Sequence, residues 1–220
     1  GYLPEALVNF VALMGWNPSG TQEIYTKEEL VEKFELEKIN KSGAVFNREK
    51  LDWLNREYIK KLSAADLRDR LTPFWSSFNV SQVPSGRVER LITLEQPRAT
   101  TLVDLARTVT EFANTPSVYD RAMLVAKKST ADIAHNRLQG LYAYLAKKTA
   151  EDFNDVKKLE TDTIGFVASQ GWTNAESLWP LRVALSNTTA SPSPFELLWA
   201  LEKEESLLRI SRASEVLHTA

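Results

Sequence analysis

The chain has 220 residues, two histidines and no cysteine, with a formal net charge of −2 at pH 7. The lack of cysteine excludes disulfides and thiolate metal sites, and only His135 and His218 offer imidazole. No apolar run approaches the ~20 residues of a membrane-spanning helix, and the first residues lack the layout of a signal peptide. We therefore expect a cytoplasmic protein with no membrane partner. Gly1 stands where an initiator methionine would, and we favour a piece excised from a longer protein over a processed product.

Charge is distributed unevenly along the chain. A pI of about 5.9 argues against a nucleic-acid partner. Residues 56–107, however, hold 9 Lys/Arg and 6 Asp/Glu, whereas residues 1–55 hold 6 and 9, and residues 108–220 hold 12 and 14. The positive segment includes Arg87, Arg90, Arg98 and Arg107. This excess of three is a weak signal, because a run of like charges is usually a solvated face.

The first part of the chain predicts helices joined by short turns. One helix should begin at Pro4 and end with Gly15 as its C-terminal cap. Its expected core face is the stripe Ala6, Leu7, Phe10, Val11 and Met14. Thr26 and Glu29 form a capping box that predicts a second helix over Leu30, Val31 and Phe34.

Polar side chains that can cap helices recur further along. Asn47 and Ser63 each precede an apolar periodic run, and Ser85 should cap a short helix. That short helix should end before Pro97, because proline disfavours helical geometry at the residue before it.

In the second half, the pattern S/T-x-x-D marks further helix starts, which are Thr101, Ser117, Ser129 and Thr149. Ser193, Pro194 and Glu196 combine an N-cap, a proline at the first position and a glutamate at the third, which is a strong start signal.

These patterns predict an all-α protein, because no convincing alternation of apolar and polar residues indicates a strand. Helix-rich blocks meet at turn residues near positions 62 and 113. We therefore predict three parts, which are residues 1–62, 63–113 and 114–220.

The sequence offers no catalytic or metal-binding constellation. It contains neither G-x-G-x-x-G nor G-x-x-x-x-G-K-[ST], and neither histidine has a neighbour at metal-ligand spacing. We expect no catalytic residues and no metal or cofactor in this chain.

Four motifs occur in a fixed order along the chain. They are GYLPEAL at 1–7, KSGAVFNREKLDWLN at 41–55, Gln96-Pro97-Arg98, and PLRVALS at 180–186. Together they resemble the tRNA-binding half of a bacterial-type glutamyl-tRNA synthetase, a class I aminoacyl-tRNA synthetase. The H-I-G-H motif of such enzymes is absent, and Lys127-Lys128-Ser129-Thr130 only faintly resembles their K-M-S-K-S loop. The resemblance implies a stem-contact region over 1–62 followed by two anticodon-binding subdomains.

The resemblance assigns the third anticodon base to Arg98, with Pro97 shaping its turn. That base is cytosine in glutamate tRNAs and guanine in glutamine tRNAs. Cytosine offers the acceptors O2 and N3 to an arginine, whereas guanine would oppose its donors with N–H groups, a mismatch of roughly 1–3 kcal/mol. An arginine at 98 therefore implies an enzyme that discriminates against glutamine tRNA. The alternative is an ordinary surface arginine in a loop.

The resemblance further implies that the first anticodon base is surrounded by Arg182, Ser191, Pro192 and Pro194. Two glycines of the family are replaced here, by Asn187 and by Glu202. Asparagine tolerates positive φ, whereas glutamate does so poorly, so we expect the helix joint at Glu202 to differ.

The expected tRNA stem and phosphate contacts are Lys41, Ser42, Lys50, Arg56 and Lys60. Trp53 belongs to the same motif, but a tryptophan is more often part of a core than an RNA-stacking group.

The interpretation we favour is the tRNA-binding C-terminal part of a glutamate–tRNA ligase that acts as a monomer. Its partners would be glutamate tRNA and the enzyme's own N-terminal Rossmann catalytic domain, which would hold ATP and Mg²⁺. A helical protein-interaction module without RNA binding is the alternative, which the acidic pI supports. A helical enzyme of unknown chemistry ranks last, because no residues would carry it.

Overall fold

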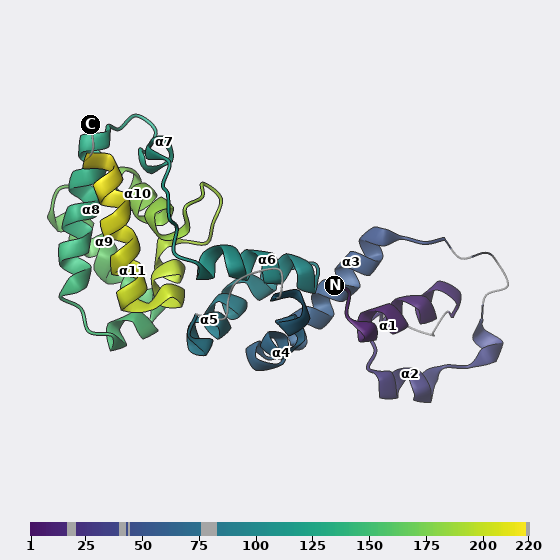
Figure 1. Ribbon diagram of the computed structural model, residues 1–220. Coiled ribbons are helices and arrows are strands. Elements are labelled where there is room, and N and C mark those ends of the chain that lie inside the picture. The colour runs from purple at the N-terminus through teal and green to yellow at the C-terminus, as the bar shows by residue number, and fades with distance from the viewer. Residues whose placement is uncertain (17–20, 40–42, 44, 76–82, 219–220) are drawn as a thin grey trace. The chain divides into compact units, whose positions relative to one another are not determined.

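The computed structural model describes residues 1–16, 21–39, 43, 45–75 and 83–218. Within these ranges the regular elements are helices, and the expected all-α class is confirmed (Figure 1). The chain forms two compact units. Unit 1 comprises Gly1–Ser81 and Glu95–Glu111, and unit 2 comprises Gln82–Leu94 and Phe112–Ala220. The division into three parts at positions 62 and 113 stays a prediction.

Unit 1 is built from short helices and two 3₁₀ turns. Its helices are α1 (Pro4–Gly15), α2 (Lys27–Lys33), α3 (Arg48–Lys61) and α4 (Ala64–Trp75), and its turns are η1 (Leu36–Lys38) and η2 (Gln96–Arg98). Two further helices, α5 (Ser85–Glu95) and α6 (Leu102–Ala113), have residues in both units.

Predicted caps in this part of the chain are confirmed by their hydrogen bonds. Thr26 and Glu29 form the reciprocal capping box of α2. Asn47 accepts from the backbone N–H of Lys50 at 3.0 Å, which starts α3. Ser63 and Thr101 make the equivalent bonds at the starts of α4 and α6. Each of these capping bonds joins residues within one helical turn, so sequence spacing alone can predict it.

The predicted core face of α1 is wrong at two positions. Val11 is 64% exposed and Leu7 is 39% exposed, whereas Ala6, Asn9 and Phe10 are buried. The buried polar residue explains the shift, because the Asn9 amide accepts from the Tyr25 N–H at 2.7 Å and donates to the Glu23 carbonyl at 2.9 Å. These bonds turn a narrower face of α1 toward the core.

The predicted glycine cap of α1 is also wrong. Gly15 is the last helical residue, and the cap is Trp16 in an extended conformation. The Trp16 side chain is buried, its ring lies 5.5 Å from that of Tyr25, and its backbone forms a bridge with Ile39. Packing of the next residue therefore ends this helix, without a left-handed glycine.

Unit 2 is a helical bundle. It contains α7 (Arg121–Leu124), α8 (Ala131–Ala146), η3 (Glu151–Asn154), α9 (Val156–Ser169), α10 (Asn174–Ser186) and α11 (Pro194–His218). The long helix α11 packs against α8, α9 and α10 (Figure 1). Ser193 and Glu196 form the predicted capping box of α11.

Three predicted caps lie at the wrong residue. Asp120, not Ser117, caps α7, and Thr130, not Ser129, caps α8. The carbonyl of Pro84 accepts the first bonds of α5, so Ser85 is already inside that helix. In each case a neighbouring residue of suitable geometry takes the role, because a cap depends on the backbone angle at one position.

The centre of unit 2 holds a buried ion pair. Arg209 is fully buried, and its Nε donates to Oε1 of Glu205 at 2.7 Å. Its two Nη atoms donate to the carbonyls of Leu185, at 2.6 Å, and Phe112, at 2.7 Å. Arg209 thereby ties the ends of α6 and α10 to α11.

The two histidines, 83 positions apart in sequence, lie together in unit 2. The rings of His135 and His218 are stacked with centroids 5.2 Å apart. Among the residues that the structure describes, no three potential metal-ligating side chains are grouped. None of the helices in those ranges is long and apolar enough to span a membrane.

Candidate nucleic-acid interface

Arg98 lies at the end of an exposed turn. The helix α5 ends at Glu95, as the proline rule predicts, and η2 then carries Pro97 and Arg98. The N–H of Ala99 closes the turn on the carbonyls of Glu95 and Gln96. The Arg98 side chain is 52% exposed.

This turn is anchored to α3 by one side chain from the turn and one from the helix. Nε2 of Gln96 donates to the carbonyls of Ile59 and Leu62, each at 2.8 Å. Just past the turn, Nδ2 of Asn55 donates to the carbonyl of Thr100 at 2.5 Å. The backbone of the turn is therefore fixed before any ligand arrives, which reduces the ordering cost of binding.

A buried carboxylate holds the guanidinium of Arg98. Nη1 of Arg98 lies 3.7 Å from Oε1 of Glu95, whose side chain is only 7% exposed. Both groups line a polar cavity of about 190 Å³, together with Thr100, Asp104, Arg107 and Thr108. The ion pair orients Arg98 and leaves half of its side chain accessible.

Arg182 lies on α10 at the wall of a second and larger cavity. This groove has a volume of about 630 Å³, and its walls include Leu178, Trp179 and Pro194. The guanidinium of Arg182 lies 4.8 Å from the Trp179 ring centre, and its Nη2 donates to the Thr189 carbonyl at 3.0 Å. Stacking and the hydrogen bond together fix the guanidinium plane.

The wall of this groove is mostly apolar, with two cationic side chains on it. Among the described residues that line it, Lys127 and Arg182 are charged and none is a carboxylate. Two of the four predicted first-base residues, Arg182 and Pro194, are thus brought together here. Ser191 is half-buried and Pro192 buried in the preceding loop, and neither belongs to the lining.

Comparison with known proteins identifies the family. The family model described as "Anticodon binding domain" matches residues 46–214. The chain belongs to the anticodon-binding domain family. A second model, described as "tRNA synthetases class I (E and Q), catalytic domain", matches residues 1–53.

Individual relatives narrow the assignment to one enzyme. The chain is 34% identical to the glutamate–tRNA ligase of Lachnoclostridium phytofermentans, over 100% of this chain and 44% of that protein. The crystal structure of a glutamate tRNA ligase from Elizabethkingia meningosepticum superposes with a TM-score of 0.82 at 27% identity, covering 99% of this chain and 42% of that one. The chain thus spans less than half the length of these relatives. It corresponds to the C-terminal anticodon-binding region of glutamate–tRNA ligase, with a small end of the catalytic domain.

The two residues that replace family glycines, Asn187 and Glu202, both have positive φ, which favours glycine. Asn187 caps α10 in the left-handed region, with φ 54° and ψ 27°, as its tolerance for positive φ predicts. Glu202 has φ 64° and ψ 174° and marks a kink within α11. Its carboxylate lies 3.9 Å from Arg87 and 3.8 Å from Arg90. Glu202 therefore has positive φ, in a region that is essentially restricted to glycine.

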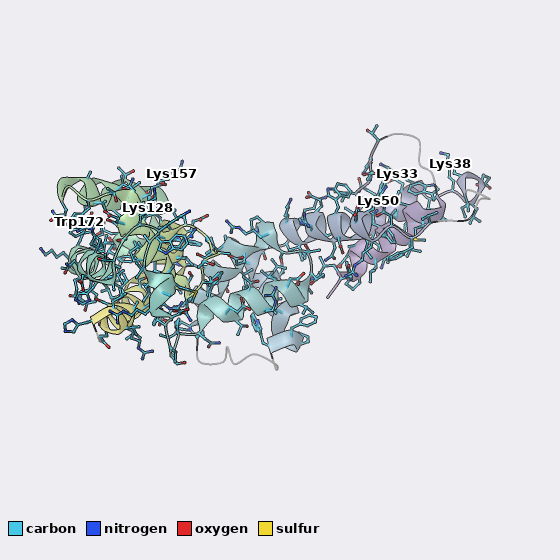
Figure 2. The ribbon with its side chains drawn as sticks, turned by 90° about the horizontal axis from the view of Figure 1, so that it is seen from above. Lys33, Lys38, Lys50, Lys128, Lys157 and Trp172 are labelled. Atoms are coloured by element: carbon cyan, nitrogen blue, oxygen red, sulfur yellow. The ribbon has the colours of Figure 1, made fainter. Side chains whose placement is uncertain are left out.

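The predicted stem-contact residues have partners within unit 1. Lys50, on α3 (Figure 2), pairs with Glu23 at 2.6 Å. Lys60 pairs with Glu57 at 2.7 Å. All four side chains are partly exposed, and such surface pairs contribute little, so phosphates could replace the carboxylates.

Arg56 has a different environment. Its Nη2 donates to Oγ1 of Thr100 at 3.1 Å, next to the Arg98 turn. This bond gives it a structural role that the sequence did not indicate. Trp53 is 38% exposed, and Lys41 and Ser42 lie outside the described residues.

Sequence reasoning gave no role to Glu95, Lys127 and Trp179, which line these two cavities, or to the side chain of Gln96, which anchors the Arg98 turn. A signal existed for Glu95, because a spacing of three from Arg98 places both residues on one side of a helical turn. Trp179 likewise lies three residues before Arg182. No sequence signal connects Gln96 with α3, because its partners are carbonyls more than 30 positions away.

Proposed function

We propose that the chain is the tRNA-binding part of a glutamate–tRNA ligase and that it recognises glutamate tRNA through the anticodon and the inner stem. Arg98 reads the third anticodon base. The observation that carries this proposal is the anchored turn, in which Gln96 and Asn55 fix the backbone and the Arg98 side chain stays accessible beside a polar cavity. RNA is commonly read in this way, by hydrogen bonds to the edge of an unstacked base.

The groove beside Arg182 supports a second base contact. It combines an aromatic face, an arginine and a lysine, which are the groups that bind an unstacked nucleotide. We assign the first anticodon base to this groove, with Arg182 and Pro194 as its contacts and Ser191 and Pro192 as the supporting loop. Lys50 and Lys60 would meet stem phosphates, and Lys41 and Ser42 belong to the same proposed contact.

The proposed parent enzyme attaches glutamate to its tRNA in the cytoplasm and acts as a monomer. Its Rossmann catalytic domain would hold ATP and Mg²⁺. The match of residues 1–53 to the catalytic family supports this arrangement.

A direct test titrates the chain with glutamate tRNA and with the same tRNA carrying guanine as its third anticodon base. We expect the guanine tRNA to bind about tenfold or more weakly, because donors would face donors. The variant Arg98→Gln should abolish most of this preference. Arg212→Gln is the matched control, because it removes the same charge from an exposed arginine that lines neither cavity.

Two outcomes would refute the proposal. If the wild-type chain binds both tRNAs equally, Arg98 does not read the third base. If no tRNA binds even at low salt, where phosphate contacts are strongest, the acidic helical domain is instead a protein-interaction module.

A further inference from the structure

The helix α1 is apolar on its exposed side as well as on its buried side. On the exposed side, Leu7, Val8 and Val11 are 39%, 55% and 64% exposed. Val11 follows Leu7 by four positions and Val8 by three, so these side chains form one patch, here called the outer face of α1. A helix that is hydrophobic all round is normally buried in a larger structure. The outer face therefore has the composition of a surface that packs against another part of a protein.

Charged residues do not interrupt the outer face. Glu5 is the single charged residue among the twelve of α1, and its carboxylate forms an ion pair with Arg70 of α4 at 2.9 Å. In α3, by contrast, eight of the fourteen residues are charged. A helix at the surface of a soluble protein normally carries charged and polar residues on the side away from the core. The exposed side of α1 does not follow this rule.

Exposed apolar side chains are concentrated in the part of the chain that matches the catalytic family. Among the described residues, fourteen large hydrophobic side chains are exposed, and ten of them lie within residues 1–53. The four others are Val103, Val118, Tyr142 and Leu208. Residues 1–53 are about a quarter of the chain, so this is a strong local excess. Concentrations of exposed apolar surface mark sites of interaction with another protein surface.

The family match identifies the partner. The model of the catalytic domain matches residues 1–53, and the chain spans less than half the length of its relatives. We propose that the outer face of α1 packs against an apolar surface of the remainder of the catalytic domain in the parent enzyme. This inference rests on the proposed function, because it assumes that the parent is a glutamate–tRNA ligase with such a domain.

The backbone before α1 is held in a way that fits this arrangement. The carbonyl of Gly1 accepts from the N–H of Leu102 at 2.8 Å, and the N–H of Leu3 donates to the Asn55 side chain at 2.8 Å. With a rise of about 1.5 Å per residue, Val11 lies roughly 10 Å along the axis from the first residue of α1. A catalytic domain that precedes Gly1 would therefore be joined to the chain within about two helical turns of the outer face.

This partner also accounts for the width of the apolar stripe of α1. The sequence predicts Leu7 and Val11 on a buried face, but the bonds of Asn9 turn a narrower face toward the core of unit 1. Contact with the catalytic domain would bury Leu7 and Val11 as well. One helix would then be shared between two cores, with Asn9 selecting the side that faces unit 1.

Thiol labelling measures whether the outer face is covered. The chain has no cysteine, so Val11→Cys introduces its single thiol. We would label this variant with a maleimide, in the chain alone and in the parent enzyme without tRNA, and quantify the modified peptide by mass spectrometry. We expect labelling at position 11 to be about tenfold or more slower in the parent enzyme, because a buried thiol is inert.

Val118→Cys is the matched control. Val118 is 75% exposed in unit 2 and lies outside the match to the catalytic family, so its labelling rate should be the same in both proteins. A second variant, Val11→Asp, should leave the urea midpoint of the chain alone unchanged, because the side chain is exposed there. It should lower the midpoint of the parent enzyme, because a carboxylate would be placed against an apolar surface. Val118→Asp should change neither midpoint.

The outcomes separate this inference from the proposed function. Equal labelling of position 11 in the two proteins, with guanine still rejected as the third anticodon base, would overturn the docking face and leave the role of Arg98 intact. Labelling of the chain alone that slows as its concentration rises would also overturn it, because the face would then join two copies of the chain. Protection of position 11 in a parent enzyme that accepts guanine would support the docking face and overturn the role of Arg98.

Discussion

The backbone at Glu202 predicts that glycine is more stable than alanine at this helical position, which is the reverse of the usual order. Inside a helix, glycine is about 1 kcal/mol less stable than alanine. At φ 64° and ψ 174°, a residue with a Cβ is strained by about 1–3 kcal/mol, and glycine is not. Glu202→Gly should therefore be more stable than Glu202→Ala.

The size of this difference follows from two opposing terms. Both variants lose the ion pairs to Arg87 and Arg90, so these contacts cancel in the comparison. Relief of strain favours glycine by about 1–3 kcal/mol. The greater freedom of glycine in the unfolded chain opposes this by about 0.4–1 kcal/mol. These terms give a net advantage for Glu202→Gly of about 0–2.6 kcal/mol, with a middle value of about 1.3 kcal/mol.

Urea denaturation followed by circular dichroism measures the difference as a shift of the midpoint at constant m-value. The same pair of substitutions at Arg212, an exposed position of ordinary helical geometry in α11, is the control. There alanine should be the more stable variant. If the alanine variant is also the more stable one at position 202, the positive φ at Glu202 does not exist in solution.

Two further predictions concern unit 2. Arg209→Leu should destabilise the fold by about 3–5 kcal/mol, because it leaves the Glu205 carboxylate and several carbonyls without their buried donor. Adding Glu205→Leu should recover part of the lost stability. An unchanged urea midpoint in the single variant would contradict this prediction. Burial raises the pKa of Tyr119 to about 12, so its contribution to stability is complete below pH 10 and is lost as the pH rises toward 12. Tyr119→Phe should be less sensitive to alkali in that window, and it should lose about 1 kcal/mol at neutral pH, because the hydroxyl donates to the Ala184 carbonyl at 2.9 Å.

Features governed by neighbours in sequence could be predicted well. The capping residues Thr26, Asn47, Ser63 and Ser193 all make the expected bonds, and Pro97 ends α5 where expected. Each involves contacts within about three residues, which sequence spacing alone defines.

Features that depend on residues distant in sequence could not be predicted. The apolar stripe of α1 was predicted too wide, because the amide of Asn9 binds the segment at 23–25 and selects which side of the helix is buried. A choice between neighbouring caps, such as Ser129 or Thr130, likewise depends on where the chain turns. Burial of Arg209 could not be anticipated, because the carbonyls it binds come from the ends of two other helices.

The candidate site shows the same division. The Pro-Arg pair and the P-L-R segment are contiguous in sequence and could be found there. The spacing of three residues could have predicted that Glu95 lies beside Arg98, but it could not have predicted that the Glu95 side chain is buried. The two bonds from the Gln96 side chain to α3 could be identified only from the folded backbone.

Through the bonds from Gln96 and Asn55, the length of α3 sets the position of the turn that carries Arg98. Asn55, Ile59 and Leu62 are spaced by four and three residues, so they form one line along the helix and hold the turn at several points. Inserting a single residue between Asn55 and Ile59 would rotate one attachment by about 100° relative to the others. The length of this stretch is therefore constrained, and changes of length should be tolerated only outside it.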